Sequence, residues 1–116
     1  MKKTIDELIL EQAREALPEA LETLREAIRI PADHVDLPET EGGDPSRGLS
    51  NHDGPRLEYL RRRIVELGAD DGPEAVGFDA VGNLWWQVED KHDGLNRDEK
   101  TVIFFDGHTD TVQALR

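Results

Sequence analysis

The chain has 116 residues, with 14 Lys+Arg against 26 Asp+Glu and a formal net charge of −12. This length suits one small domain, and the absence of cysteine excludes a disulfide scaffold and a thiol nucleophile. The acidic excess argues against nucleic acid as a partner, because phosphates attract clustered Lys and Arg.

The distribution of apolar residues also bears on where the protein is located. No apolar run approaches the roughly 20 residues that a bilayer crossing requires, so we expect no membrane partner. The N-terminal residues Met1–Glu7 contain lysine but lack the apolar core of a secretion signal, and we expect a cytoplasmic protein. Dense carboxylates with few lysines also fit adaptation to high salt, which we hold as a hypothesis.

Residues 4–29 have the pattern of an amphipathic helix. Thr4 and Glu7 form the sequence signature of a capping box. Apolar residues then recur at spacings of three and four. Because proline lacks an N–H and clashes with the preceding turn, Pro18 predicts a kinked helix or two abutting ones, and Pro31 ends the pattern.

A loop and a second helix follow. Residues 31–54 are rich in Pro, Gly and Asp without a period and predict a long loop. Asp53 offers an N-cap and Pro55 a first-turn residue. Apolar side chains then follow at helical spacing up to Gly68, a residue typical of a left-handed C-cap.

The pattern then changes to a period of two. Residues 75–89 alternate around a turn-forming stretch and predict a hairpin or two neighbouring strands. Residues 90–100 predict a polar loop. The continuous apolar run Thr101–Phe105 is typical of a strand buried on both faces, as in parallel sheets. The order of elements predicts an α/β fold.

The residues with chemical potential follow that last run, as Asp106-Gly107-His108-Thr109-Asp110. Ligands of open α/β sheets bind at the carboxyl ends of strands. With a period of two, His108 and Asp110 point to the same side. Imidazole is a common zinc ligand, and a neighbouring carboxylate can orient its ring. Asp106 is also two residues from His108, so spacing leaves open which carboxylate does this.

The stretch from Val102 to Val112 resembles the first metal-binding motif of the M20 metallopeptidase family. Three earlier segments resemble landmarks of that family in the same order: Ile28–Pro31, Leu57–Gly68 and Phe78–Leu84. The motif is most similar to that of hydrolases like acetylornithine deacetylase and succinyl-diaminopimelate desuccinylase. The resemblance implies that residues 1–116 form the N-terminal portion of a catalytic domain, with a mostly parallel sheet flanked by helices, interrupted by the long loop 31–54.

The resemblance also implies an activity. His108 would bind one of two zinc ions, or other divalent metals, and Asp110 would orient its imidazole. Such enzymes hydrolyse an amide bond in an N-acyl amino acid or small peptide with a water whose pKa the metals lower. The other ligands and the general base lie downstream in the family. We therefore expect this chain alone to be inactive, to need the remainder of the catalytic domain as a missing segment or a separate chain, and to be capable of forming a homodimer.

An alternative comes from a different class of protein. The chain can also be interpreted as a non-catalytic, acidic interaction module in which the His-x-Asp sequence is only structural. The remaining histidines, His34, His52 and His92, lie in polar segments, and we interpret them as solvated. Trp85 and Trp86 are adjacent, so on a strand they face opposite sides, and we expect one of them in the core.

Overall fold

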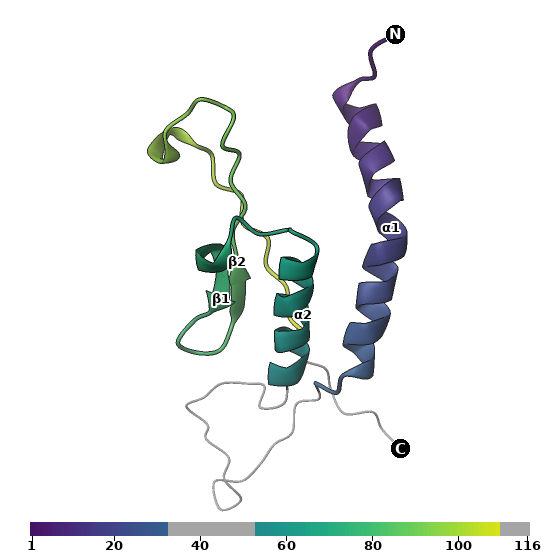
Figure 1. The fold of residues 1–116 in the computed structure, drawn as a ribbon, viewed down its shortest axis with the longest axis vertical. Coiled ribbons are helices and arrows are strands. Elements are labelled where there is room, and N and C mark those ends of the chain that lie inside the picture. Colours follow the sequence, from purple (N-terminus) through teal and green to yellow (C-terminus); the bar gives the residue numbers. More distant parts are fainter. Residues whose placement is uncertain (33–52, 110–116) are drawn as a thin grey trace, which may run out of the picture. The chain divides into compact units, whose positions relative to one another are not determined.

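The structure is a computed structural model that describes residues 1–32 and 53–109. The chain divides into two compact units, residues 1–30 and residues 31–116. The first consists of helix α1, and the second carries helix α2, a two-stranded antiparallel sheet and the segment that leads to His108 (Figure 1).

Helix α1 spans Ile5–Arg29 and begins with the predicted capping box. The Glu7 N–H donates to Thr4 Oγ1 at 3.2 Å, and the Thr4 N–H donates to Glu7 Oε2 at 2.8 Å. Two backbone donors that the first turn leaves without helical partners are thereby satisfied. The predicted start of this helix is confirmed.

The helix runs without interruption through Pro18, so the alternative of two abutting helices is wrong. Proline removes one backbone hydrogen bond, and the flanking turns of Glu, Ala and Leu, which are good helix formers, maintain the helix on both sides. The predicted end is confirmed. Ile30 is extended, with φ −85° and ψ 114°, because the residue before a proline is pushed out of the helical region.

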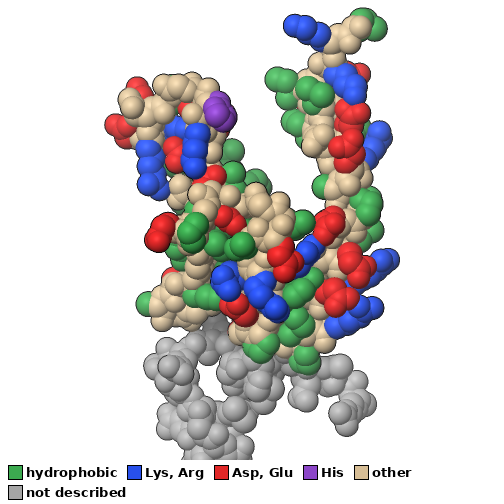
Figure 2. Space-filling model, viewed as in Figure 1, with side chains coloured by type: hydrophobic (Ala, Val, Ile, Leu, Met, Phe, Trp, Pro, Cys, Tyr) green, Lys and Arg blue, Asp and Glu red, His purple; other side chains and the backbone are tan. Residues whose placement is uncertain are grey.

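Helix α1 presents a broad apolar face. Its large hydrophobic side chains are exposed along its whole length, as the green side chains in Figure 2 show. They are Ile5, Leu8, Ile9, Leu10, Leu17, Leu21, Leu24 and Ile28. Such a face is typical of a helix whose apolar side packs against a protein core.

Helix α2 spans Gly54–Glu66 and ends as the sequence predicts. Gly68 has φ +63°, the left-handed conformation that glycine adopts without steric cost. Its N–H donates to the Val65 carbonyl at 3.0 Å, and the Ala69 N–H donates to the Ile64 carbonyl at 2.9 Å. These two bonds form a Schellman motif. At the other end Asp53 occupies the N-cap position, but its side chain makes no capping hydrogen bond.

The expected hairpin is confirmed by strands β1 (Val76–Phe78) and β2 (Leu84–Trp86), which pair antiparallel. A 3₁₀ turn, η3 (Pro73–Ala75), leads into β1. The register places Trp85 opposite Gly77. The indole of Trp85 lies over this glycine, where an added Cβ would be 3.6 Å from the ring.

One side chain organises the turn between the strands. Asp79 Oδ1 accepts hydrogen bonds from the N–H groups of Val81 and Asn83, and the Asn83 side chain donates to Asp79 Oδ2 at 2.9 Å. These bonds to the ionised form, the Asn83 side chain foremost, lower the pKa of Asp79.

The neighbouring tryptophans differ from expectation. Trp85 and Trp86 are both exposed to a substantial extent, so the expectation that one of them is core is wrong for this structure. A two-stranded sheet offers little surface with which to cover a large indole.

The predicted buried strand at Thr101–Phe105 is not formed. Residues 101–109 have no regular secondary structure, and Phe104 and Phe105 are 90% and 94% exposed. A strand buried on both faces needs a hydrogen-bonded neighbour and a covering layer on each side, and the described residues place neither beside this run. The parallel sheet of the expected α/β fold therefore stays a prediction.

Candidate functional site

His108 lies in the stretch of residues 101–109, which has no regular secondary structure. His108 is exposed, and Thr109 is partly buried. Asp106, the alternative partner for the imidazole, is also exposed. Asp110 falls outside the described residues, so its predicted role as the residue that orients the ring stays a prediction.

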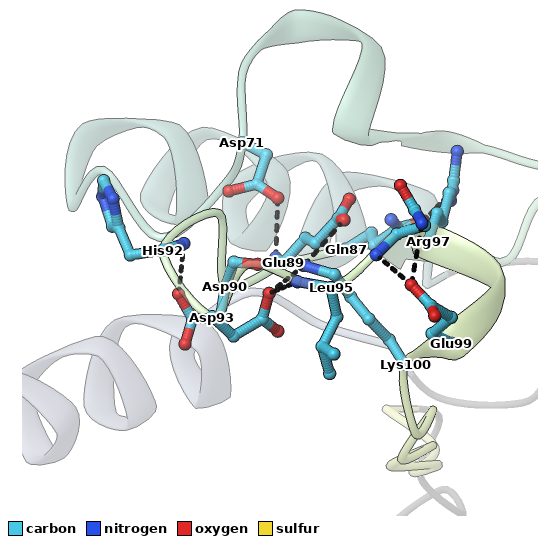
Figure 3. A network of polar contacts seen from close by, with 11 residues as sticks. Asp71, Gln87, Glu89, Asp90, His92, Asp93, Leu95, Arg97, Glu99 and Lys100 are labelled. Carbon is cyan, nitrogen blue, oxygen red and sulfur yellow. Dashed lines mark hydrogen bonds and ion pairs between the residues drawn. The ribbon is translucent and has the colours of Figure 1, made fainter.

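The segment begins at Lys100, which closes the polar loop before it (Figure 3). The ammonium group of Lys100 lies 3.1 Å from Glu89 Oε1 and 3.1 Å from Asp93 Oδ1, and it also donates to the carbonyl of Asp90. An ammonium group has three donors, and here each has an acceptor. These contacts join the end of the loop at Lys100 to residues near its beginning, and they restrain the position of Lys100.

Further bonds stabilise this loop. The Glu89 N–H donates to Asp71 Oδ2 at 2.7 Å, and Arg97 donates to the Gln87 side chain at 3.1 Å. A single 3₁₀ turn, η4 (Arg97–Glu99), is capped by Asn96. The loop is therefore held by a network of polar contacts, although residues 90–99 are exposed to solvent.

The charges of this cluster reinforce one another. Partial burial opposes the ionised form of Lys100, but hydrogen bonds from its ammonium group to Glu89 and Asp93 outweigh that effect and raise its pKa. The Leu95 N–H, and then Lys100, favour the ionised form of Asp93 and lower its pKa. Both groups are charged near neutral pH.

The segment is also held at its far end, by Arg56 of helix α2. Nη1 of Arg56 donates a hydrogen bond to the carbonyl of Thr109, the residue after His108. The two residues are 53 positions apart in the sequence. Arg56 is 8% exposed, the only charged residue that is buried in the described part of the chain.

Arg56 was not among the residues that the sequence pattern indicated. It lies in the first turn of α2, where the positive end of the helix dipole disfavours a cation. No acidic residue accompanies it in that turn. This mismatch between residue type and helix position is a signal in the sequence that could have identified Arg56 as a residue with a long-range partner.

The donor set can be compared with what zinc requires. A catalytic zinc ion takes about three protein ligands. Within residues 1–32 and 53–109, no three His, Cys, Asp or Glu side chains lie close enough together to hold a metal ion. The described residues therefore do not form a zinc site by themselves, and they contribute His108 as a single candidate ligand.

The remaining histidines give no competing site in the described ranges. His92 lies exposed in the polar loop, and its backbone N–H donates to Asp90 Oδ1 at 2.8 Å. His34 and His52 fall outside the described residues. No helix in the described ranges combines the length and the hydropathy that a bilayer crossing requires.

Comparison with protein families, with curated proteins and with solved structures found no match to this chain.

Proposed function

We propose that this chain is part of a metal-dependent amidohydrolase in which His108 supplies one metal ligand. The observation that carries this proposal is the sequence Asp106-Gly107-His108-Thr109-Asp110 directly after an apolar β-type run. The exposure of His108 supports it, because a metal ligand contributed to a shared site must be accessible to the other ligands.

The chemistry is limited to what the residues can do. His108 offers an imidazole nitrogen as the ligand, and the Asp110 carboxylate is proposed to accept a hydrogen bond from the other ring nitrogen and so to fix the ring orientation. The other ligands and the general base would come from additional polypeptide. The substrate class is an amide bond in an N-acyl amino acid or small peptide, and the bound divalent metals would supply Lewis-acid chemistry there.

The experiment removes the imidazole in the complete protein. In His108→Ala we expect the zinc content of the purified protein and its amidase turnover both to fall, with turnover lower by two or more orders of magnitude because the metal site loses a ligand. His92→Ala removes another exposed imidazole and serves as the matched control, with zinc content and turnover unchanged.

The opposite result has a clear meaning. If His108→Ala keeps the zinc content and turnover of the unmodified protein, His108 is not a ligand. The interpretation of the chain as an acidic interaction module with a structural His-x-Asp would then be favoured.

A further inference from the structure

We propose that the Asp106–Gly107 peptide unit is a site of spontaneous covalent modification, at which Asp106 isomerises to isoaspartate. The chain has four Asp-Gly pairs, which begin at Asp53, Asp71, Asp93 and Asp106, and all four lie in the described ranges. The same carboxyl group precedes the same glycine nitrogen in each pair. Differences in reactivity between the pairs therefore come from their surroundings.

The reaction uses only atoms of the pair and water. The Gly107 nitrogen bonds to Cγ of Asp106 and loses its proton, and one carboxyl oxygen leaves as water, which closes a succinimide ring. Water then adds to the ring carbonyl that derives from the main chain and breaks its bond to the nitrogen, so that the main chain runs through Cβ and Cγ. Glycine favours ring closure, because it has no Cβ to shield the nitrogen and its backbone adapts without steric cost.

Helix α2 holds the Asp53–Gly54 unit against this reaction. Asp53 has φ −85° and ψ −10°, and its carbonyl accepts a hydrogen bond from the Leu57 N–H at 2.9 Å. Because a peptide unit is planar and rigid, a bond to its carbonyl also fixes the direction of its nitrogen. Ring closure at this pair would have to turn the unit and open the first turn of the helix.

Hydrogen bonds hold both reacting groups of the Asp71–Gly72 pair. The Gly72 N–H, which carries the attacking nitrogen, donates to Asp70 Oδ1 at 2.6 Å. Asp71 Oδ2 accepts a hydrogen bond from the Glu89 N–H at 2.7 Å (Figure 3). Both bonds must break before the nitrogen of Gly72 can reach the carboxyl carbon of Asp71.

The Asp93 carboxyl group is held in the Lys100 cluster. Its Oδ1 accepts a hydrogen bond from the Leu95 N–H at 2.9 Å and lies 3.1 Å from Lys100 Nζ (Figure 3). These contacts also favour the ionised form and lower the pKa of Asp93. A carboxylate is a poorer electrophile than the neutral acid, so the same contacts oppose ring closure at Asp93–Gly94.

The Asp106–Gly107 unit lacks restraints of these kinds. Within residues 1–32 and 53–109, neither the Asp106 carboxyl group nor the peptide unit that joins it to Gly107 takes part in a hydrogen bond or an ion pair. Both residues are exposed and lie outside regular secondary structure. A Cβ built on Gly107 would have no neighbouring atom within 4 Å. Water and the carboxyl carbon can therefore both approach the reacting atoms.

The first experiment compares the four pairs in one sample. The full chain is incubated near neutral pH below its melting temperature and digested with trypsin, and electron-transfer mass spectrometry locates isoaspartate. Cleavage after Lys and Arg places the pairs on separate peptides, residues 48–56, 64–91, 92–97 and 101–116. We expect isoaspartate to form at Asp106 about fivefold faster than at the other three pairs, or more, because each of those must first break a hydrogen bond.

The same incubation in denaturing urea is the control. Urea removes the contacts at Asp53, Asp71 and Asp93, so we expect the rates at the four pairs to converge. Equal rates in the folded chain would overturn the proposal. A lead of Asp106 that persists unchanged in urea would also overturn it, because the folded structure would then not be the cause.

Variants test the two sides of the argument. Gly107→Val shields the attacking nitrogen and should stop isoaspartate formation at Asp106, with a smaller reduction in Gly107→Ala. Both side chains have room, and Gly107 does not have a positive φ. Lys100→Met removes one contact of Asp93 and should raise the rate there by about fivefold, whereas Lys91→Met, which removes an exposed lysine of the same loop, should not. An unchanged rate at Asp106 in Gly107→Val, or at Asp93 in Lys100→Met, would contradict the proposal.

The modification has a consequence for His108 that rests on the proposed function. Isoaspartate adds one methylene to the main chain two residues before His108, which changes the course of the chain that leads to the imidazole. In aged complete protein, separated by ion exchange, we expect the form with isoaspartate at residue 106 to have lost its amidase turnover and the unmodified form to keep it. Full turnover in the modified form would overturn this consequence. If the unmodified form has no amidase activity, the proposed function fails, whereas the comparison of the four pairs still decides the modification.

Discussion

At Lys100, one ammonium group closes a loop by bonding to Glu89, Asp93 and the carbonyl of Asp90 (Figure 3). Exposed ion pairs usually contribute little, because water screens them and ordering long side chains costs entropy. This cluster differs, because the Lys100 side chain is only 13% exposed and a single group satisfies acceptors from three residues.

The pH range of this closure follows from the two pKa directions. The pKa of Asp93 is lowered, so its contribution to stability is present above its ordinary pKa of about 3.9 and is lost as pH falls through its folded-state value. The pKa of Lys100 is raised, so its contribution is present below about 10.4 and is lost as pH rises through its folded-state value. The loop is closed between these limits.

Removing the ammonium group tests this arrangement. In Lys100→Met we expect the pKa of Asp93 to rise toward its ordinary value but to stay below it, because the Leu95 N–H still donates to the carboxylate at 2.9 Å. A ¹³C titration of the Asp93 carboxyl group measures this. Lys91→Met removes an exposed lysine of the same loop and should leave the titration unchanged. An unaltered Asp93 titration in Lys100→Met would contradict the role of the lysine.

At the scale of elements, the helix ends are fixed by local chemistry. The Schellman motif after α2 needs a left-handed residue at position 68, where φ is +63°. A side chain in that conformation costs roughly 1–2 kcal/mol, and no neighbouring atom lies within 4 Å of an added Cβ. The cost of a substitution there would therefore come from the backbone alone.

Two glycines at opposite ends of α2, Gly54 as its first residue and Gly68 just beyond its end, distinguish a backbone cost from a steric one. We expect Gly68→Ala to lower the free energy of unfolding of this unit by about 1 kcal/mol. Gly54, the first residue of α2, has equally open surroundings and a negative φ, so Gly54→Ala should be neutral or slightly stabilising. Urea denaturation measures both. Equal effects of the two substitutions would show that backbone conformation at residue 68 is not the cause.

The sequence predicted correctly those features that depend on interactions between residues close together in the chain. The capping box of Thr4 and Glu7, the cap at Gly68 and the 76–86 hairpin depend on residues within a few positions of one another, and all are confirmed. At Pro18 the sequence left open one kinked helix or two abutting ones, because the outcome depends on how well the flanking turns tolerate one missing hydrogen bond, and the structure has a single helix there.

The other features could not be predicted because they depend on contacts between residues far apart in the sequence. The run Thr101–Phe105 has strand composition, but a strand is made by neighbours that its own residues do not specify. At the candidate site, His108 could be identified from its own motif, whereas Arg56 bonds to a residue 53 positions away. Only the mismatch of a cation in a first helical turn marks it in the sequence.

At the scale of the whole molecule, the net charge of −12 predicts a salt effect. Like charges repel one another in the folded state, and salt screens this repulsion. We expect the melting temperature at neutral pH to rise with KCl, and to keep rising into the molar range if the surface is adapted to high salt. The rise should be smaller near the isoelectric point of about 4.6, which serves as the control. A melting temperature independent of KCl at neutral pH would remove the hypothesis of salt adaptation.

The placement of the two tryptophans makes the hairpin separately observable. Both lie in β2, so tryptophan fluorescence, excited selectively over that of Tyr59, reports on the surroundings of that strand, and the indole over Gly77 makes its emission sensitive to loss of the pairing. Ellipticity at helical wavelengths, in contrast, is dominated by the 25 residues of α1. The two signals, recorded during one thermal melt, would therefore coincide only if the helical unit and the strand-bearing unit unfold together.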